Sequence, residues 1–380
     1  MRFQLSEEQE MAIAVIREFA EKEVAPAAGK RDENQYFDRA LFDQIGGLGL
    51  AGIAIPEQYG GAGSDILTFA IVIEELSRVC ASTAAVLAVH TAYTMFPILK
   101  FGSEELKQRA LKPLALGEKL GGFGSRSASE KSIRKKNSLW YRDKGDHVVL
   151  NGIQPLLVNA GAADLYVIIA DQINTKNRRK CNAYVIESGI PGMNVGIPKT
   201  KLGLRSLMTS DLLFDNCIVS KENRLGKEGQ GEEIISAALA IGYISAAAQA
   251  VGIAQGAMEA ATSYAKERKQ FGIQIGRRQG VSFKLSDMAA KIEAARLLTY
   301  QASWRLNEGL TSRKETAIAK KFATDTAVAV TLEAIQVLGG YGYMREYRME
   351  RFLRDAKCLE SEIGTGGIRA DWIKDILSAE

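Results

Sequence analysis

Two short segments in the last third of the chain contain residue types that could hold a phosphate-bearing ligand. The first reads Glu-Arg-Lys-Gln-Phe-Gly at residues 267–272, and the second reads Gln-Val-Leu-Gly-Gly-Tyr-Gly-Tyr at residues 336–343. An arginine guanidinium suits a diphosphate because its planar fork matches phosphate oxygens. Glycine has no side chain, so a ligand can come close to its backbone. These residue types are therefore suited to a phosphate-bearing ligand, without specifying which one.

Each segment is followed by a further characteristic sequence. Phe-Lys-Leu-Ser-Asp-Met occupies residues 283–288, and Arg-Asp-Ala-Lys occupies residues 354–357. At these spacings the run resembles the C-terminal domain of the acyl-CoA dehydrogenases, flavoproteins that introduce a double bond between Cα and Cβ of an acyl thioester. The loop Pro-Glu-Gln-Tyr-Gly-Gly-Ala-Gly at residues 56–63 resembles a Pro-Glu-x-Tyr-Gly-Gly loop of the same family. The resemblance extends over nearly the whole chain.

The resemblance implies FAD as the cofactor. In the family, the arginine and the Gln-Phe of the first segment contact the FAD pyrophosphate and ribityl region, often across a subunit boundary. The glutamine and the second glycine of the second segment approach the same dinucleotide, and a threonine near the C-terminus contacts the nucleotide. Alternatively, the matching residues are kept only for packing and helix-end geometry. The candidate cofactor-binding residues are Arg268, Gln270, Phe271, Gln336, Gly340 and Thr365.

The residue expected to remove the substrate α-proton is missing. In the family, six residues separate Asp-Ala-Lys from a Gly-Thr, and the last of the six is the catalytic glutamate; the same spacing places Ile363 there. Other members carry the glutamate on a bundle helix just before an arginine, where this chain has Gly242 and Tyr243. Neither pattern leaves a base in place. Glu362 remains as the candidate catalytic residue, unless it forms a salt bridge or faces solvent.

The segments that meet the flavin ring in the family are also altered. A Leu-Thr-Glu-Pro segment corresponds to residues 125–128, where Arg126 replaces the threonine. An aromatic-Ile-Thr-Asn segment corresponds to residues 156–159, where Val158 replaces a hydroxyl donor near flavin N5. Losing that donor should weaken flavin polarisation, because stabilising the charge that develops there helps the ring accept hydride. We therefore expect weaker FAD binding and a non-standard active site.

The order of sequence patterns predicts three domains. Ser6 and Gln9 form a capping-box pattern at the start of a first helix, and apolar residues at helical spacing follow. Short β-rich runs separated by turn residues begin near residue 121. No proline follows Pro198, and Ala-rich stretches at helical spacing fill the remainder. We predict an α+β fold of the acyl-CoA dehydrogenase type, with an N-terminal all-helical domain at 1–118, a middle β domain at 119–231 and a C-terminal helical bundle at 232–380.

One other glycine pattern matches a dinucleotide-binding fingerprint. Residues 47–52 read Gly-Leu-Gly-Leu-Ala-Gly, which satisfies G-x-G-x-x-G. A true fingerprint follows a strand and opens a helix, whereas residues 39–45 are predicted to end a helix. We therefore interpret these glycines as a helix cap and turn.

The composition is that of a soluble globular protein. A formal charge of +4 is too small to indicate nucleic acid by itself, and we expect none. Four widely spaced cysteines fit a reduced cytoplasmic interior without disulfides or zinc. His90 lies in an apolar run and is predicted to be a packed core residue, and no metal site is expected. The N-terminus does not read as a signal peptide, and we expect no apolar run to be long enough to span a bilayer. We therefore expect a cytoplasmic protein without membrane contact.

Basic residues gather in two places along the middle of the chain. They are either solvated loops or attractive surfaces for an acidic or phosphate-rich partner. Coenzyme A and an acyl-carrier protein both fit that description. The two groups are Lys131, Arg134, Lys135 and Lys136, and Lys176, Arg178, Arg179 and Lys180.

Three functional hypotheses remain open. The first is α,β-dehydrogenation of an acyl thioester on CoA or an acyl-carrier protein, with an electron-transferring flavoprotein as the implied acceptor. The second is a non-catalytic subunit that pairs with an active homologue. The third is another FAD chemistry on the same fold, such as oxygen activation. Under the resemblance Arg268 reaches a neighbour's FAD, so we expect a homo-oligomer, either a dimer or a homotetramer of two dimers.

Overall fold

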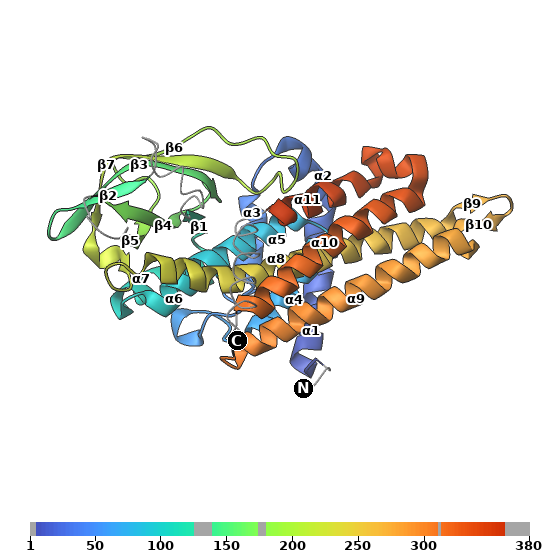
Figure 1. The fold of residues 1–380 in the computed structure, drawn as a ribbon, viewed down its shortest axis with the longest axis horizontal. Helices are drawn as coiled ribbons and strands as arrows, with labels where there is room; N and C mark the ends of the chain where they lie inside the picture. The colour runs from blue at the N-terminus through green and yellow to red at the C-terminus, as the bar shows by residue number, and fades with distance from the viewer. Residues whose placement is uncertain (1–4, 125–138, 174–179, 311–312, 362–380) are drawn as a thin grey trace, which may run out of the picture.

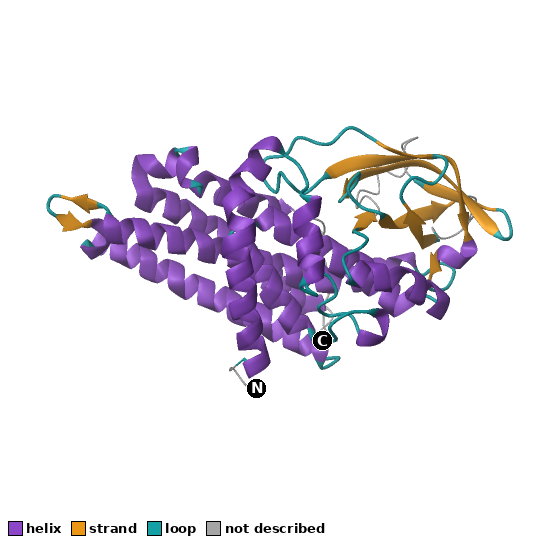
Figure 2. Ribbon diagram, turned by 180° about the vertical axis from the view of Figure 1, so that it is seen from behind, coloured by secondary structure: helices purple, strands orange, loops and turns teal. Residues whose placement is uncertain are grey.

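The computed structural model confirms the predicted fold class: helices come first, a sheet domain follows and a long helical bundle completes the chain (Figures 1 and 2). The sheet lies at one end of the molecule, and a small β-hairpin projects from the opposite end of the bundle (Figure 1). The structure describes residues 5–124, 139–173, 180–310 and 313–361.

The N-terminal helices begin at the predicted capping box. Gln9 N donates to Ser6 Oγ at 3.2 Å, and Ser6 N donates to Gln9 Oε1 at 3.0 Å, so two free backbone donors at the helix start are satisfied. The elements are α1 (Glu7–Phe19), the π-helical turn η1 (Ala20–Val24), α2 (Ala25–Asn34), α3 (Arg39–Gly47), η2 (Glu57–Tyr59), α4 (Ile66–Ser77), α5 (Ala81–Ala88), the π-helical η3 (Val89–Met95), α6 (Phe96–Phe101) and α7 (Glu104–Ala115).

The glycines of residues 47–52 form a turn, as predicted, and not a dinucleotide fingerprint. They follow α3, a helix, and Gly49 takes a left-handed backbone with φ 72°. A Cβ on Gly52 would lie 2.7 Å from the carbonyl oxygen of Ala115. Glycine is therefore needed because the end of α7 packs directly against this turn.

The middle domain is built on a sheet of eight strands within the described residues. Its order is β6-β7-β3-β1-β4-β5-β8, and β2 bonds to β3 and β4. In β1, Phe123 lies opposite Val167 of the parallel strand β4 and opposite Val158 of the antiparallel strand β3. β1 therefore sits at the centre of the sheet. The strands are β1 (Gly121–Gly124), β2 (Trp140–Asp143), β3 (His147–Val158), β4 (Leu165–Gln172), β5 (Cys181–Glu187), β6 (Met193–Val195), β7 (Thr209–Ser220) and β8 (Arg224–Leu225), with the 3-10 turn η4 (Lys221–Asn223).

His90 joins the helical domain to the first strand. Its ring is fully buried, Gly121 N donates to His90 Nδ1 at 2.9 Å, and His90 Nε2 donates to the carbonyl oxygen of Leu114 at 3.1 Å. Burial lowers the pKa of His90 to about 4, so the ring stays neutral at physiological pH. The prediction of a packed core histidine is confirmed.

Helix α8 is the axis against which the N-terminal helices pack. A Cβ on Gly252 would lie 2.1 Å from the carbonyl oxygen of Glu74 in α4, so glycine allows the two helices to touch. Arg296 Nε from α9 donates to Glu74 Oε1 at 2.8 Å, and burial raises the pKa of that carboxyl. The bundle is made of α8 (Gly231–Glu267), β9 (Lys269–Gln270), β10 (Ile273–Gln274), η5 (Ile275–Arg277), α9 (Gln279–Asn307), α10 (Arg313–Leu338), η6 (Gly339–Tyr343), η7 (Arg345–Tyr347) and α11 (Met349–Ser361).

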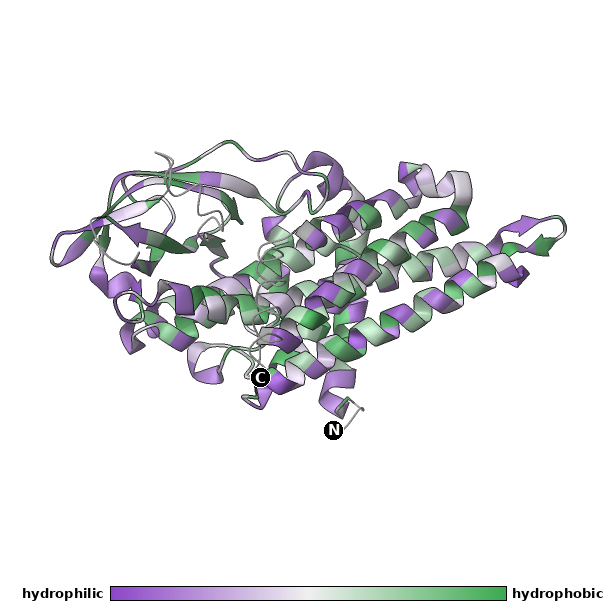
Figure 3. Ribbon diagram, viewed as in Figure 1, coloured by the Kyte–Doolittle hydropathy of each residue, from purple (hydrophilic) through white to green (hydrophobic). Residues whose placement is uncertain are grey.

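Among the described residues, three helical runs are long and apolar enough to cross a membrane by length and composition alone. They are Ala81–Phe101, Gly231–Glu267 and Lys314–Tyr343. The prediction that no apolar run has this length is therefore wrong. Within the protein, 78%, 72% and 50% of the residues in their most apolar windows are buried, and helices that are apolar on several sides are those that a large bundle encloses. Hydrophobic and hydrophilic stripes alternate along the bundle helices (Figure 3).

Candidate functional site

The two glycine-containing segments both follow the ends of long helices. α8 ends at Glu267 and continues into the β9–β10 hairpin. The hairpin turns at Phe271 and Gly272, whose φ values are 52° and 81°; this backbone conformation is uncommon for any residue other than glycine. α10 ends at Leu338, and Gly339 continues with φ 60° into η6. In Figure 1 the hairpin projects from the end of the bundle where α10 turns toward α11.

One open pocket of about 740 Å³ unites the two segments. Five of the six residues predicted to bind the cofactor line it, although some precede α9 in the sequence and others follow it. The sixth, Thr365, lies outside the described residues. The structure thus brings the predicted residues together, while their binding of FAD remains a prediction. The five are Arg268, Gln270, Phe271, Gln336 and Gly340.

The pocket is cationic and has an aromatic wall. The guanidinium of Arg268 lies 5.6 Å from the ring centroid of Tyr341. The ring centroid of Tyr341 lies 6.1 Å from that of Tyr264 and 5.0 Å from that of Tyr347. None of the described residues that line the pocket is acidic. A phosphate group could therefore bind the guanidinium, and a planar ring could pack on the tyrosines.

Gly340 is open to the pocket. A Cβ built on Gly340 meets nothing within 4 Å, whereas one on Gly342 would lie 2.5 Å from the carbonyl oxygen of Ile335. The described part of the chain therefore explains the glycine at 342 by its own packing, but it does not explain the glycine at 340. An approaching ligand would explain it, because a ligand needs the backbone surface that a side chain would cover.

Arg278 lines the same pocket and was not predicted from the sequence. It lies ten residues after Arg268 and belongs to neither segment, so no motif indicates it. The hairpin between them turns the chain back, and Arg278 Nη2 donates to the carbonyl oxygen of Gln270 at 3.0 Å. Its guanidinium stacks 5.1 Å from the ring centroid of Phe271. The remaining lining residues that sequence reasoning missed are Tyr264, Ile275, Val281, Val337, Leu338, Gly339, Tyr341 and Met344.

The described part of the predicted flavin-ring region is held by Asn159. Its backbone is left-handed with φ 60°, and its Nδ2 donates to the carbonyl oxygens of Val86 at 3.3 Å and Gly121 at 2.9 Å. Asn159 Oδ1 is buried and has no hydrogen-bond partner among the described residues. Val158 faces Phe123 across the sheet. The altered residues Arg126, Ser127 and Ala128 lie outside the described residues.

The alternative base position at Gly242 is closed by packing. Gly242 is buried in α8, and a Cβ built there would lie 2.1 Å from Tyr93 Oη. A glutamate at this position would therefore require Tyr93 to move. Tyr243 is also buried, and Lys320 Nζ lies 5.9 Å from its ring centroid. The predicted candidate base Glu362, and Ile363 beside it, lie outside the described residues.

A polar joint fastens α11, the helix that leads to the predicted base position. Leu204 N, in the loop before β7, donates to Asp355 Oδ1 at 2.7 Å, and Arg354 Nη2 donates to Asp32 Oδ2 of α2 at 2.6 Å. A Cβ on Gly203 would lie 2.3 Å from the carbonyl oxygen of Arg354. Elements from all three parts of the chain therefore meet at this joint.

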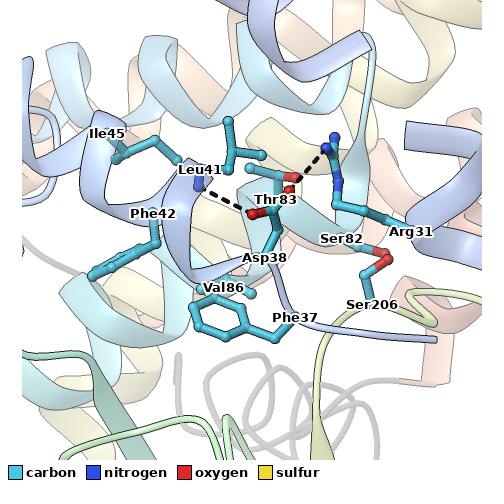
Figure 4. Close-up of a pocket in the computed structure, with 10 residues that line it drawn as sticks. All are labelled: Arg31, Phe37, Asp38, Leu41, Phe42, Ile45, Ser82, Thr83, Val86 and Ser206. Atoms are coloured by element: carbon cyan, nitrogen blue, oxygen red, sulfur yellow. Dashed lines mark hydrogen bonds and ion pairs between the residues drawn. The ribbon is translucent and has the colours of Figure 1, made fainter. Parts of the chain in front are cut away.

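Figure 4 shows a separate small cavity of about 20 Å³, lined by Arg31, which precedes Asp32 in the sequence, and by Ser206, two residues after Leu204. Arg31 Nη1 pairs with Asp38 Oδ2 at 3.5 Å, and Asp38 Oδ1 accepts from Leu41 N at 3.2 Å. Arg31 Nε and Ser206 Oγ are buried without a hydrogen-bond partner among the described residues. The volume fits about one water molecule, so this cavity is too small for an acyl group.

Of the two predicted basic clusters, only Lys180 belongs to the described residues, and its Nζ lies 3.6 Å from Glu228 Oε1. Across all the described residues, no three His, Cys, Asp or Glu side chains converge as a metal site would require. None of the four cysteines forms a disulfide bond within the described residues.

Comparison with known proteins matches most of the chain. Residues 6–118 match the model of the acyl-CoA dehydrogenase N-terminal domain, and residues 229–377 match that of the C-terminal domain. An acyl-CoA dehydrogenase of Bacillus subtilis is 43% identical over 368 residues, covering 96% of each chain. A short-chain specific acyl-CoA dehydrogenase of Clostridium acetobutylicum is 41% identical, covering 97% of each.

Solved structures give the same result. A chain from a structure of the electron transferring flavoprotein of Acidaminococcus fermentans has a TM-score of 0.95 and 40% identity, with 100% of both chains covered. Butyryl-CoA dehydrogenase from Megasphaera elsdenii has a TM-score of 0.91 and 37% identity, with 95% of both chains covered. The prolyl acyl carrier protein oxidase AnaB has a TM-score of 0.91 and 29% identity, covering 99% of this chain and all of its own.

Proposed function

The chain belongs to the acyl-CoA dehydrogenase family of flavoprotein oxidoreductases, and on this basis we propose that it binds FAD and oxidises an acyl thioester between Cα and Cβ. The observation that carries the proposal is the pocket at the end of the bundle. Arg268 and Gly340, predicted separately from two segments, line it together. Its cationic wall and open glycine are what the diphosphate of a dinucleotide needs.

Residues at both ends of the proposed cofactor site fit FAD. Arg268 would hold the diphosphate, and the backbone at Gly340 would lie against the nucleotide. At the other end, the unpaired Oδ1 of Asn159 offers an acceptor for a donor that the described chain does not supply. When bound, FAD supplies the acceptor for the hydride that leaves the substrate Cβ.

Proton removal is the step for which this chain lacks the family's base. Ile363 and Gly242 occupy the two positions where the family places its base, and neither side chain accepts a proton. Glu362 is the proposed substitute. Because the adjacent Ile363 occupies the family's base position, Glu362 would lie near the substrate but not at that position. We therefore propose a slow dehydrogenase with a non-standard active site.

A second candidate function is a non-catalytic subunit that pairs with an active homologue. The isoleucine at 363 favours it, because a subunit without a base could still lend structure or half of a shared FAD site. A third is another FAD chemistry, such as oxygen activation. The similarity to the oxidase AnaB supports both this chemistry and an acyl-carrier protein as the substrate carrier in place of CoA.

The proposed assembly is a dimer or homotetramer. Phe271 at the hairpin tip is 91% exposed, and Tyr343 in η6 is 84% exposed. We propose that a neighbouring subunit covers these two side chains in the assembly. Similarity to the Acidaminococcus structure supports an electron-transferring flavoprotein as the redox partner. Four cysteines without a disulfide bond among the described residues support a cytoplasmic location.

The visible spectrum of the purified protein tests the proposal. We expect flavin absorption in the wild type and its loss in Arg268→Ala, with Lys269→Ala, an exposed neighbour, as the control. Unchanged FAD content in Arg268→Ala would show that this pocket does not hold the cofactor. Anaerobic addition of an acyl-CoA then separates the functions: bleaching indicates dehydrogenation, and a yellow protein that no acyl thioester bleaches indicates the second or third candidate.

A further inference from the structure

Arg278 is held in place from two sides. On one edge, its Nη2 donates to the carbonyl oxygen of Gln270 at 3.0 Å. Across one face, its guanidinium carbon lies 5.1 Å from the ring centroid of Phe271. These contacts fix the side chain before any ligand arrives, and a fixed guanidinium loses less conformational freedom on binding.

The charge of Arg278 has no carboxylate partner among the described residues, and one of its donors has no acceptor there. Its Nε is buried and has no hydrogen-bond partner among the described residues. Neither Arg278 nor Arg268 forms an ion pair with a carboxylate in that part of the chain, and the described lining of the pocket contains no acidic residue. A buried donor without a partner is unfavourable, and the charge that no carboxylate balances is available to an anion that enters the pocket.

Resting on the proposed function, we infer that Arg278 is a second guanidinium ligand to the diphosphate of the bound dinucleotide, acting together with Arg268. A diphosphate carries about two negative charges and several acceptor oxygens, so two guanidinium groups neutralise it better than one. The positive end of the α9 dipole adds to their charge, because the helix begins at Gln279, directly after Arg278. The site would therefore select a nucleotide with a diphosphate.

The test compares variants of two adjacent arginines. Arg278→Gln keeps a polar side chain of similar length but removes the charge, and Arg278→Lys keeps the charge but loses the fork. Arg277→Gln is the matched control, because Arg277 is exposed and does not line the pocket. Two ligands are titrated against the flavin-depleted protein by calorimetry: FAD, and ADP, which has the diphosphate and adenosine without the flavin.

We expect Arg278→Gln to weaken the binding of both FAD and ADP about tenfold or more. Arg278→Lys should be intermediate, and Arg277→Gln should equal the wild type. Equal affinities in Arg278→Gln and Arg277→Gln would overturn the inference and leave the proposed function standing. A loss for FAD without a loss for ADP would also overturn it, because the contact would then lie elsewhere. A wild type that binds neither ligand would overturn the proposed function as well.

Discussion

The carboxylate of Asp355 in α11 accepts a 2.7 Å hydrogen bond from the backbone N–H of Leu204, 151 residues earlier in the chain. Asp355 is buried, and burial raises its pKa to about 6 from an ordinary 3.8. The charges of Arg351 and Arg354 act in the opposite direction, and that of Asp32 adds to the rise. A group that titrates near neutrality thus lies at the joint between the middle domain and the bundle.

Asp355 makes the stability of the protein dependent on pH. Because its folded pKa lies above its unfolded pKa, its contribution is fully present below about pH 4 and is lost as the pH rises through about 6, by up to about 3 kcal/mol. Asp355→Asn keeps an acceptor for Leu204 but does not titrate. In urea unfolding, the variant should therefore gain stability relative to the wild type between pH 4 and 7. A difference that does not change with pH would contradict this prediction.

The contact between Gly242 and Tyr93 predicts coupled mutations. Gly242→Ala places a Cβ 2.1 Å from Tyr93 Oη, so we expect a loss of about 1–3 kcal/mol in the free energy of unfolding. Tyr93→Leu in the same chain should recover part of that loss. Gly47→Ala is the control, because a Cβ there meets nothing within 4 Å. Strictly additive effects in a double-mutant cycle would show that the two residues do not touch.

Ile363 predicts slow turnover of acyl-CoA substrates. A positioned base contributes about 10²–10⁴-fold to such a step, so the wild type should be slower than its relatives by roughly that factor. Ile363→Glu should raise the rate of anaerobic flavin bleaching, and Ile363→Gln, which has no proton acceptor of comparable basicity, should not. Brisk wild-type activity that Glu362→Gln leaves unchanged would mean that the base lies elsewhere.

The exposed tip of the hairpin predicts how the protein assembles. Light scattering of the wild type at micromolar concentration should give a dimer or a tetramer. Phe271→Asp should lower the measured mass, because it places a charge where we expect an apolar contact. Ile197, which is 85% exposed on the middle domain, supplies the control variant Ile197→Asp. A monomeric wild type would contradict the prediction and weaken the proposed nucleotide site.

The fold and five of the fourteen described residues that line the pocket could be predicted because their signals are local. A capping box at Ser6, short β-rich runs and long helical periodicity each depend on neighbours in sequence. Arg268 and Gly340 were recognisable because each stands in a segment of characteristic residues. The pocket that unites them required only that α8 and α10 end at the same end of the bundle.

The contacts that could not be predicted connect distant positions. Arg278 enters the pocket only because the hairpin turns at Phe271, which carries a left-handed backbone that its residue type does not suggest. Likewise, the sequence shows a glycine at 242 but not the hydroxyl of Tyr93 against it. The apolar helices were misjudged because local composition does not distinguish burial in a bundle from burial in a bilayer.

The ion pair between Asp32 and Arg354 has a consequence for biosynthesis. Its partners are 322 residues apart, and a ribosome adds about 5–20 residues per second. Arg354 is therefore synthesised roughly 16–64 s after Asp32. During that time the contact between α2 and α11 cannot form, so the joint between the first and last helices stays incomplete. Folding of this chain is completed only after synthesis is nearly finished.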